Sequence, residues 1–365
     1  MAELVVKTEN IIRNIQKLDD FLKKQNIQWS LVSKVLSGDI SFLKKILTDD
    51  IVNRLHSVGD SRLSSLKTIK KLNPELITIY IKPPAQSLVS NIVRYADISV
   101  NTSFQTIEAL STEAVKQKKI HKILIFIELG ELREGVVREN IVEFYKKVFN
   151  LPNIEIIGIG SNLGCMYGIE PTYDKLLQLS LFKQLLEQMF NKKIPLISGG
   201  SSITLPLISR KLVPKAINHF RIGEAAFFGT SPLDNKRFQK LSTDTFRFNA
   251  NVIELEEKNS VPDGVISDAS IGHTSELLEN EPLYKTYRAI MDFGILDVDV
   301  NDIKPKDENI NFIGTTSDMT VYDIGQNINS QLKAKYQVGN KMTFIPNYMA
   351  TARLMNSKFI DLKIE

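Results

Sequence analysis

Residues 194–224 read IPLISGGSSITLPLISRKLVPKAINHFRIGE, and this stretch carries the pattern that decides the fold. It contains two short apolar runs, Ile194–Ile197 and Ala216–Phe220, and each run leads into a glycine-containing loop. Short apolar runs bounded by turn residues are typical of buried parallel strands. The same pattern recurs upstream along most of the chain.

Eight such runs alternate with amphipathic stretches between about residue 8 and residue 230, a span that fits the roughly 250 residues of a (β/α)₈ barrel. The runs are Gln28–Val32, Leu55–Val58, Leu76–Ile81, Ile98–Val100, Ile123–Ile127, Ile154–Ile159, Ile194–Ile197 and Ala216–Phe220. The helical stretches begin with one that Thr8 can cap and include Phe42–Leu47, Ser64–Leu72, Ser87–Tyr95, Thr106–Gln117, Glu139–Phe149 and Tyr173–Phe190. The alternation predicts an α/β fold with a TIM barrel. A doubly wound open sheet is the alternative, and the strand count favours the barrel.

The pattern changes from about residue 240 onward. Short β-like runs follow one another there without a long amphipathic helix: Thr245–Leu255, Arg288–Phe293, Asn311–Ile313, Met319–Ile324 and Met342–Ile345. We therefore expect a barrel over residues 1–233 and a separate, mainly-β C-terminal domain over residues 234–365. The turn-rich stretch Thr230–Asn235 is the expected joint.

Composition excludes several classes of protein. The 365 residues carry 46 basic and 42 acidic side chains, and the net charge of +4 is spread along the chain, so we expect no nucleic-acid partner. Cys165 is the only cysteine, which excludes an intramolecular disulfide and a multi-cysteine zinc site, and we expect no metal. No apolar run approaches the roughly 18 residues that span a bilayer. We expect a cytoplasmic protein without a membrane partner.

The active site of a (β/α)₈ barrel lies where the strands end and the following loops begin. The loop Ser198–Ser202 has two glycines that admit a ligand close to the backbone, and serine hydroxyls and free N–H groups that can hold a phosphate. Arg221–Glu224, after the eighth strand, can add further N–H groups. The plain alternative for each loop is a tight turn with a serine cap. The other loops at this end are Gly59–Arg62, Glu128–Gly135 and Gly158–Cys165.

Lys34 directly follows the first strand. Most lysines are solvated surface charges. A lysine at the end of a barrel strand can instead be desolvated, which favours its neutral form, and such a lysine can form a Schiff base. His56, His121 and His219 lie near or within strands, and we expect them to be structural.

Together these segments resemble the fold-type III pyridoxal-phosphate enzymes of the alanine racemase superfamily, and most closely the ornithine/alanine racemase branch. The resemblance rests on segments that occur in order along the chain: Ser33-Lys34-Val35 with Ser37-Gly38, Asp60-Ser61-Arg62, Glu128–Gly135, Ser161–Cys165 with Gly168, Ser198–Leu205, Ile217–Glu224, Arg288–Gly294, Thr316-Ser317-Asp318 and Asn347-Tyr348. They cover most of the barrel and extend into the β domain.

The resemblance implies a role for each matching residue. Lys34 would hold pyridoxal 5'-phosphate as an internal aldimine and act as one acid/base. Arg221 would face the pyridine nitrogen and keep it unprotonated, because a guanidinium does not give up its proton. The other expected cofactor contacts are Arg133 near the phenolic oxygen, Asn162 beside the ring, and Ser201, Ser202, Gly223, Glu224 (through its backbone N–H) and Tyr348 at the phosphate.

The implied activity is the interconversion of L- and D-amino acids, of the ornithine, lysine or alanine type, by two-base proton transfer at the α-carbon of an external aldimine. The implied assembly is a homodimer in which the partner's β domain completes each site. The chain departs from the alanine racemase pattern at residues 293–299, which read FGILDVD and hold no tyrosine. We expect Asp297, then Asp318, then His273 as the second acid/base, although each also fits a purely structural role. Met319 stands where ornithine-type relatives often carry histidine, which leaves the substrate open.

Two other functions compete with a racemase. A non-catalytic pyridoxal-phosphate-binding protein would resemble the barrel alone, so the β domain argues against it. A metal-assisted lyase or aldolase of this fold type would need metal ligands in the β domain, which has one histidine and no cysteine. A barrel enzyme of unrelated chemistry is a further alternative.

Overall fold

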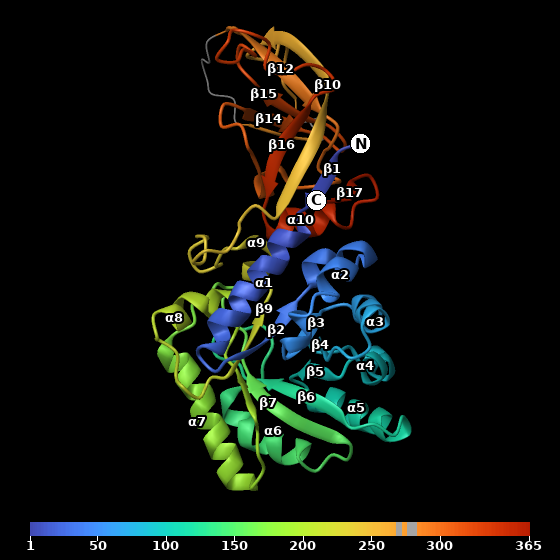
Figure 1. Cartoon of the computed structure of the whole chain (residues 1–365), viewed down its shortest axis with the longest axis vertical. Helices are drawn as coiled ribbons and strands as arrows, with labels where there is room; N and C mark the ends of the chain where they lie inside the picture. The colour runs from blue at the N-terminus through green and yellow to red at the C-terminus, as the bar shows by residue number, and fades with distance from the viewer. Residues whose placement is uncertain (268–271, 276–282) are drawn as a thin grey trace. The chain divides into compact units, whose positions relative to one another are not determined.

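The chain forms two compact units in a computed structural model that describes residues 1–267, 272–275 and 283–365 (Figure 1). One unit comprises Thr8–Thr243, and the other combines Met1–Lys7 with Asp244–Glu365. The boundary thus lies at residues 243 and 244, whereas the sequence placed it at 233 and 234. The first seven residues belong to the second unit because strand β1 (Glu3–Val6) pairs with strands of that unit.

The first unit is a closed barrel of eight parallel strands, as the apolar runs predict. Its strands are β2 (Gln28–Val32), β3 (Ser57–Asp60), β4 (Thr78–Tyr80), β5 (Ile98–Asn101), β6 (His121–Phe126), β7 (Ile154–Gly160), β8 (Leu196–Ser198) and β9 (His219–Ile222). The open-sheet alternative is wrong, because the first and last strands pair in parallel register from Gln28↔His219 to Leu31↔Ile222.

Helices follow the strands around the barrel (Figure 1). They are α1 (Thr8–Lys23), α2 (Ile40–Leu47), α3 (Leu63–Leu72), α4 (Val89–Tyr95), α5 (Phe104–Lys116), α6 (Ile141–Val148), α7 (Tyr173–Phe190), α8 (Leu205–Ser209) and α9 (Glu224–Phe228). Short 3-10 turns include η1 (Lys34–Leu36) and η5 (Ser202–Thr204). Helix α1 buries Ile11, Ile15, Leu18 and Leu22, whose spacing puts them on one face.

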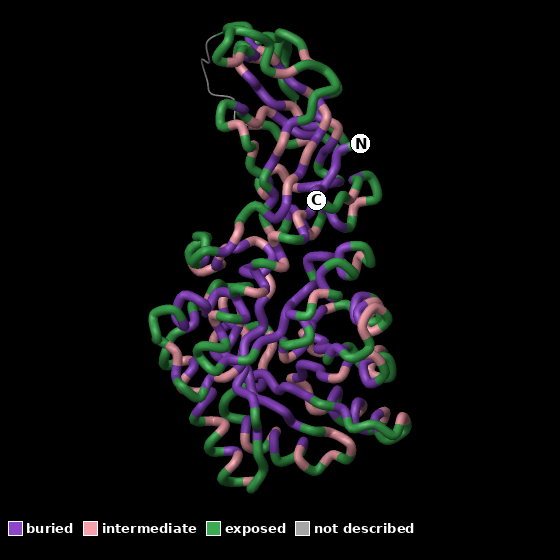
Figure 2. Tube along the Cα trace, viewed as in Figure 1, coloured by how far each residue is buried: buried purple, intermediate pink, exposed green. Residues whose placement is uncertain are grey.

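The inside of the barrel is apolar on one side and polar on the other. Ile79, Ile98, Leu124, Phe126 and Leu196 belong to its apolar cluster, where a fully buried aliphatic or Phe side chain contributes about 1.5–3 kcal/mol. The strands are mostly buried, as the purple segments of Figure 2 show. The polar side is formed by buried serines and a histidine on β2, β3, β8 and β9, which are described below.

The second unit is a mainly-β sheet, as predicted. Its strands run in the order β11-β14-β15-β12-β10-β1-β17, with β16 paired to β10 and to β13. The bounds are β10 (Phe246–Asn259), β11 (His273–Thr274), β12 (Lys285–Met291), β13 (Ile303–Pro305), β14 (Asn311–Thr315), β15 (Thr320–Asp323), β16 (Lys341–Pro346) and β17 (Asp361–Ile364), with helix α10 at Tyr348–Leu354. Phe248, Phe293 and Phe344 pack in its core with ring centroids 5.0–5.9 Å apart.

No helix within the described ranges has both the length and the apolar character needed to cross a membrane.

Candidate functional site

Lys34 begins the turn η1 immediately after β2, at the carboxyl end of the barrel. Ser37 and Gly38 close this turn with positive φ angles of 52° and 76°. A Cβ on Gly38 would lie 2.8 Å from the Ser65 Oγ, so the turn requires glycine. Lys34 is exposed in the single chain. Strand β2 therefore delivers the amine to the mouth of the barrel rather than into its core.

Two carboxyl groups, those of Asp60 and Glu224, interact electrostatically with Lys34. Asp60, at the end of β3, is 1% exposed, and burial raises its pKa to about 6 although N–H groups of Arg62 and Ser61 and the charge of Lys34 oppose the rise. Burial also raises the pKa of Glu224, again against the effect of Lys34. Sequence reasoning assigned Glu224 only a backbone role and Asp60 none. The available signal for Asp60 was its position directly after an apolar strand.

Arg221 lies on β9 and is 5% exposed. Its guanidinium donates to the Ser198 Oγ and to the Ser161 carbonyl oxygen, the latter at 2.8 Å, and lies over the Phe126 ring at 4.4 Å. Burial lowers the pKa of Arg221 to about 10, with Glu134 raising it and Arg133 lowering it. The side chain therefore stays charged at neutral pH and is held in one orientation.

Arg133 lies in the loop after β6 and is exposed. It forms an ion pair with Glu134 and contacts the Cys165 Sγ in the loop after β7. The hydrogen bond to Glu134 is the main cause that raises the pKa of Arg133. Arg133 and Arg221 influence each other electrostatically, so the structure brings these two predicted cations to the same end of the barrel.

Glu131 holds the loop after β7 in place. Its carboxylate is 1% exposed and accepts hydrogen bonds from the N–H groups of Gly164, Cys165, Tyr167 and Ile169, at 2.8–3.3 Å. Burial raises the pKa of Glu131, but these backbone bonds outweigh that effect and lower it overall. Sequence reasoning missed this residue, since its partners lie more than thirty residues away.

The loops after β8 and β9 form a cradle at the mouth. Gly200 has φ +132°, and a Cβ there would lie 2.6 Å from the Thr204 Oγ1. The buried Ser202 Oγ accepts a hydrogen bond from the Ala225 N–H at 3.1 Å, which ties the two loops together. A Cβ on Gly223 would meet the Val32 carbonyl oxygen at 3.0 Å. A ligand can therefore come close to the backbone and hydroxyl groups of the cradle, because glycine has no side chain in the way.

Three buried polar atoms near this cradle have no hydrogen-bond partner among the described residues: the Ser161 Oγ, the Asn162 Nδ2 and the Thr204 Oγ1. A buried polar group left unpaired costs about 1–3 kcal/mol. Orphaned donors in a cradle beside a buried arginine fit a polar, anionic ligand. The residues present therefore fit a phosphate-bearing cofactor.

The remaining predicted residues lie in the second unit. His273 on β11 pairs with Thr315 of β14, and the turn at Gly294–Asp297 packs on residues 316–318, so all three candidate acid/bases lie on neighbouring segments. His273 and Asp318 are exposed. Asp297 is 8% exposed, and both of its oxygens accept hydrogen bonds, from the Gly294 N–H and the Ser357 Oγ. Tyr348 begins helix α10 and is half-buried.

A family model described as "Alanine racemase, N-terminal domain" matches residues 6–232. The chain is 33% identical to an ornithine racemase of Acetoanaerobium sticklandii over 325 residues, which cover 86% of this chain and 88% of the relative. It is 28% identical to a lysine racemase of Thermotoga maritima over 98% of this chain and 97% of the relative. A crystal structure of an alanine racemase from Bartonella henselae with covalently bound pyridoxal phosphate has a similar fold, with a TM-score of 0.74, 13% identity and coverage of 100% and 99%.

Proposed function

Because the chain belongs to the fold-type III alanine racemase family, near its ornithine racemase branch, we propose that it is a pyridoxal-phosphate-dependent racemase of a basic amino acid of the ornithine or lysine type. The observation that carries the proposal is the arrangement at the barrel mouth. Lys34 after β2, the buried Arg221 on β9 and the cradle after β8 and β9 all lie at the carboxyl ends of the strands.

The residues that we propose to hold the cofactor are Lys34, Arg133, Asn162, Ser201, Ser202, Arg221, Gly223, Glu224 and Tyr348. When bound, pyridoxal phosphate supplies an electron-withdrawing ring that acidifies the α-hydrogen of the attached amino acid. The unpaired Asn162 Nδ2 gives this assignment a physical basis, because a bound group would supply its missing acceptor.

Arg221 sets the electronic character of the site. Its guanidinium is a donor only and stays protonated at neutral pH, so it would offer a hydrogen bond to the ring nitrogen of the cofactor without transferring a proton. The Ser161 carbonyl oxygen and the Phe126 ring fix its plane. With the cofactor bound, this arrangement would favour rapid return of the proton over side reactions that need a more electron-withdrawing ring.

Lys34 would move the proton on one face of the α-carbon. Its neighbours Asp60 and Glu224 are both carboxyl groups whose pKa is raised by burial. At neutral pH Asp60 is largely ionised and stabilises a cationic Lys34, while at mildly acidic pH this support weakens.

The second face needs another acid/base. Asp297 is occupied in holding its own turn through Gly294 and Ser357. Asp318 and His273 are exposed, so a substrate can reach their side chains, and we propose Asp318 ahead of His273. Asp297 ranks third for this role.

Proton exchange tests the function. The purified protein is loaded with pyridoxal phosphate and incubated with L-ornithine, L-lysine or L-alanine in deuterated water. We expect α-deuteration and D-isomer formation with a basic amino acid, and loss of both in Lys34→Ala. Cofactor binding without exchange of any amino acid would overturn the racemase in favour of a binding protein.

We also propose that the active species is a cytoplasmic homodimer in which the partner's β unit completes each site, as the resemblance to the alanine racemase family implies. Activity is then expected to fall as the protein is diluted to monomers, as followed by light scattering. Full activity of a proven monomer would refute the shared site.

A further inference from the structure

A column of hydrogen-bonded side chains runs inside the barrel behind Arg221. The Ser198 Oγ accepts from Arg221 and lies 2.9 Å from the His219 Nδ1. The His219 Nε2 lies 2.9 Å from the Ser30 Oγ, which lies 2.7 Å from the Ser57 Oγ. All of these side chains are buried, and His219 is completely inaccessible.

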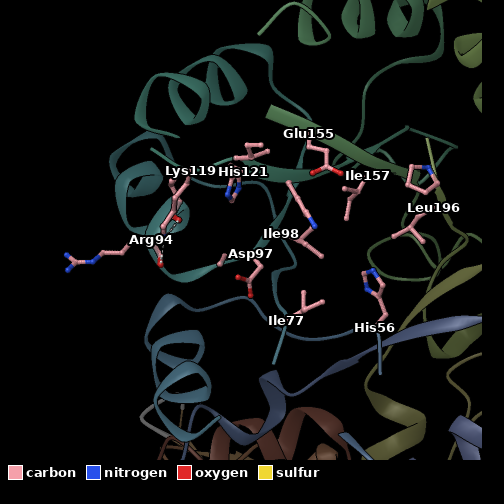
Figure 3. Close-up of a pocket in the computed structure, with 15 residues that line it drawn as sticks. His56, Ile77, Arg94, Asp97, Ile98, Lys119, His121, Glu155, Ile157 and Leu196 are labelled. Carbon is pink, nitrogen blue, oxygen red and sulfur yellow. Dashed lines mark hydrogen bonds between the residues drawn. The ribbon is translucent and has the colours of Figure 1, made fainter. Parts of the chain in front are cut away.

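The column continues to the opposite end of the barrel. The Ser57 Oγ lies 3.2 Å from the Nδ1 of His56, whose ring packs edge-on against His219 at 4.7 Å. His56 lines a cavity of about 570 Å³ at the amino ends of the strands, together with Asp97, His121 and Glu155 (Figure 3). The column therefore connects the candidate active site to the far mouth of the barrel.

Arg221 fixes the direction of these hydrogen bonds, because a guanidinium can only donate. Ser198 accepts from it, and the acceptor within reach of the Ser198 hydroxyl is the His219 Nδ1. The proton of His219 is then on Nε2, which donates to Ser30.

The surroundings of His219 also favour a neutral imidazole. Burial lowers the pKa of His219 well below its usual value, and the nearby His56 and Arg221 lower it further. Burial and Lys122 lower the pKa of His56. A cationic His219 would place a second charge next to a buried guanidinium, and its Nδ1–H would leave the Ser198 hydroxyl without an acceptor for its hydrogen.

We propose that His219 is a positioning residue for Arg221: as a neutral imidazole protonated on Nε2, it orients the Ser198 hydroxyl and so holds the guanidinium in place. The inference deepens the proposed function and rests on it in one respect, namely that Arg221 faces the cofactor ring. The hydrogen-bond state of the column itself does not depend on that assignment.

Nuclear magnetic resonance of the histidine rings tests the column without cofactor. The chain has only four histidines, so ¹⁵N-labelled histidine gives four ring systems, and the His219 signals are assigned by their loss in His219→Asn. We expect the Nε2–H tautomer of His219 throughout the neutral pH range, with an Nδ1 shift that moves in Ser198→Ala. An Nδ1–H tautomer or a cationic ring would overturn the proposal.

A matched pair of variants tests the consequence for Arg221. Asn at position 219 keeps an acceptor near the place of Nδ1, whereas Gln keeps a donor near the place of Nε2. His219→Gln and Ser198→Ala are expected to lower kcat about 10-fold to 100-fold with a smaller change in KM, as a slightly misplaced catalytic group does. His219→Asn is expected to lose less than His219→Gln.

Affinity for pyridoxal phosphate, titrated by fluorescence, is a second readout. It should weaken less in His219→Asn than in His219→Gln. His121→Asn and His121→Gln are the controls, since His121 is also buried in the barrel wall but bonds to Ser99 outside the column. Equal losses in both members of the His219 pair, with folding intact by circular dichroism, would refute a positioning role. Failure of the wild type to bind cofactor or racemise would refute the proposed function and leave the tautomer result standing.

Discussion

Replacing Glu131 by Gln removes the charge that holds the loop after β7 while keeping the size of the side chain. The two carboxylate oxygens of Glu131 accept four backbone hydrogen bonds, from Gly164, Cys165, Tyr167 and Ile169. An amide has one oxygen and one NH₂ group, so in either orientation two of the four N–H groups lose their acceptor.

The magnitude follows from this geometry. A hydrogen bond to a charged, buried group contributes about 1.5–3 kcal/mol, so the closed loop loses roughly 3–6 kcal/mol in Glu131→Gln. The loop opens once that loss exceeds its own opening free energy, and the barrel strands stay folded. The effect therefore appears as local opening of residues 164–169 rather than as global unfolding.

Hydrogen exchange read by mass spectrometry measures this opening. Peptides covering residues 164–169 should exchange much faster in Glu131→Gln, with little change in the strands. The pKa of Glu131 is lowered in the fold, so its stabilisation is present above the unfolded pKa and is lost as pH falls through the folded pKa. Glu187→Gln is the control, because Glu187 accepts one backbone bond, from Ile194. Unchanged exchange of the loop in Glu131→Gln would show that the carboxylate does not hold it.

Three further predictions concern Gly200 in the cradle, the buried Asp60 near Lys34, and Asp318 as the proposed acid/base on the second face of the α-carbon. Gly200→Ala should weaken pyridoxal-phosphate binding and destabilise the fold by about 1–3 kcal/mol, because Gly200 has a φ of +132° and a Cβ there would contact Thr204. Gly168→Ala is the control: Gly168 has a φ of +71° and a Cβ there would meet nothing within 4 Å, so cofactor affinity should stay unchanged in the same titration. Burial raises the pKa of Asp60 from 3.8 to about 6. As pH rises through that window, the free energy of unfolding of the wild type should therefore fall by about 3 kcal/mol relative to that of Asp60→Asn. The same pH dependence of the two unfolding free energies, measured by urea unfolding, would contradict this. Asp318→Asn should lower racemisation about 100-fold or more, mainly by slowing α-proton exchange from one enantiomer, whereas equal rates from both enantiomers at wild-type level would assign the second face to another residue.

The barrel was predictable because its strands are buried on both faces and read as apolar runs, so all eight were found within a few residues of their ends. Lys34 and Arg221 were predictable as residues at strand ends, where barrels place their sites. β13 and β17 were missed because most of their residues are not buried and give no apolar run. β1 was missed because its four residues directly precede the amphipathic pattern of helix α1.

The supports of the site could not be predicted in the same way. The role of Glu131 depends on N–H groups of a loop that only the fold brings near. The column behind Arg221 depends on Ser30 and His219 pointing inward from neighbouring strands, and a period-two pattern does not show which polar residues meet across a closed barrel.

The pairing of β1 with β10 and β17 makes the barrel an insertion within the β unit, entered after Lys7 and left at Asp244. During synthesis the barrel is a continuous segment that can fold as soon as it has emerged. The β unit is discontinuous: β1 precedes the barrel in the chain, and its partner strands follow only after the whole barrel. A change in β1 therefore acts on a unit that can be completed only after the whole barrel has been synthesised.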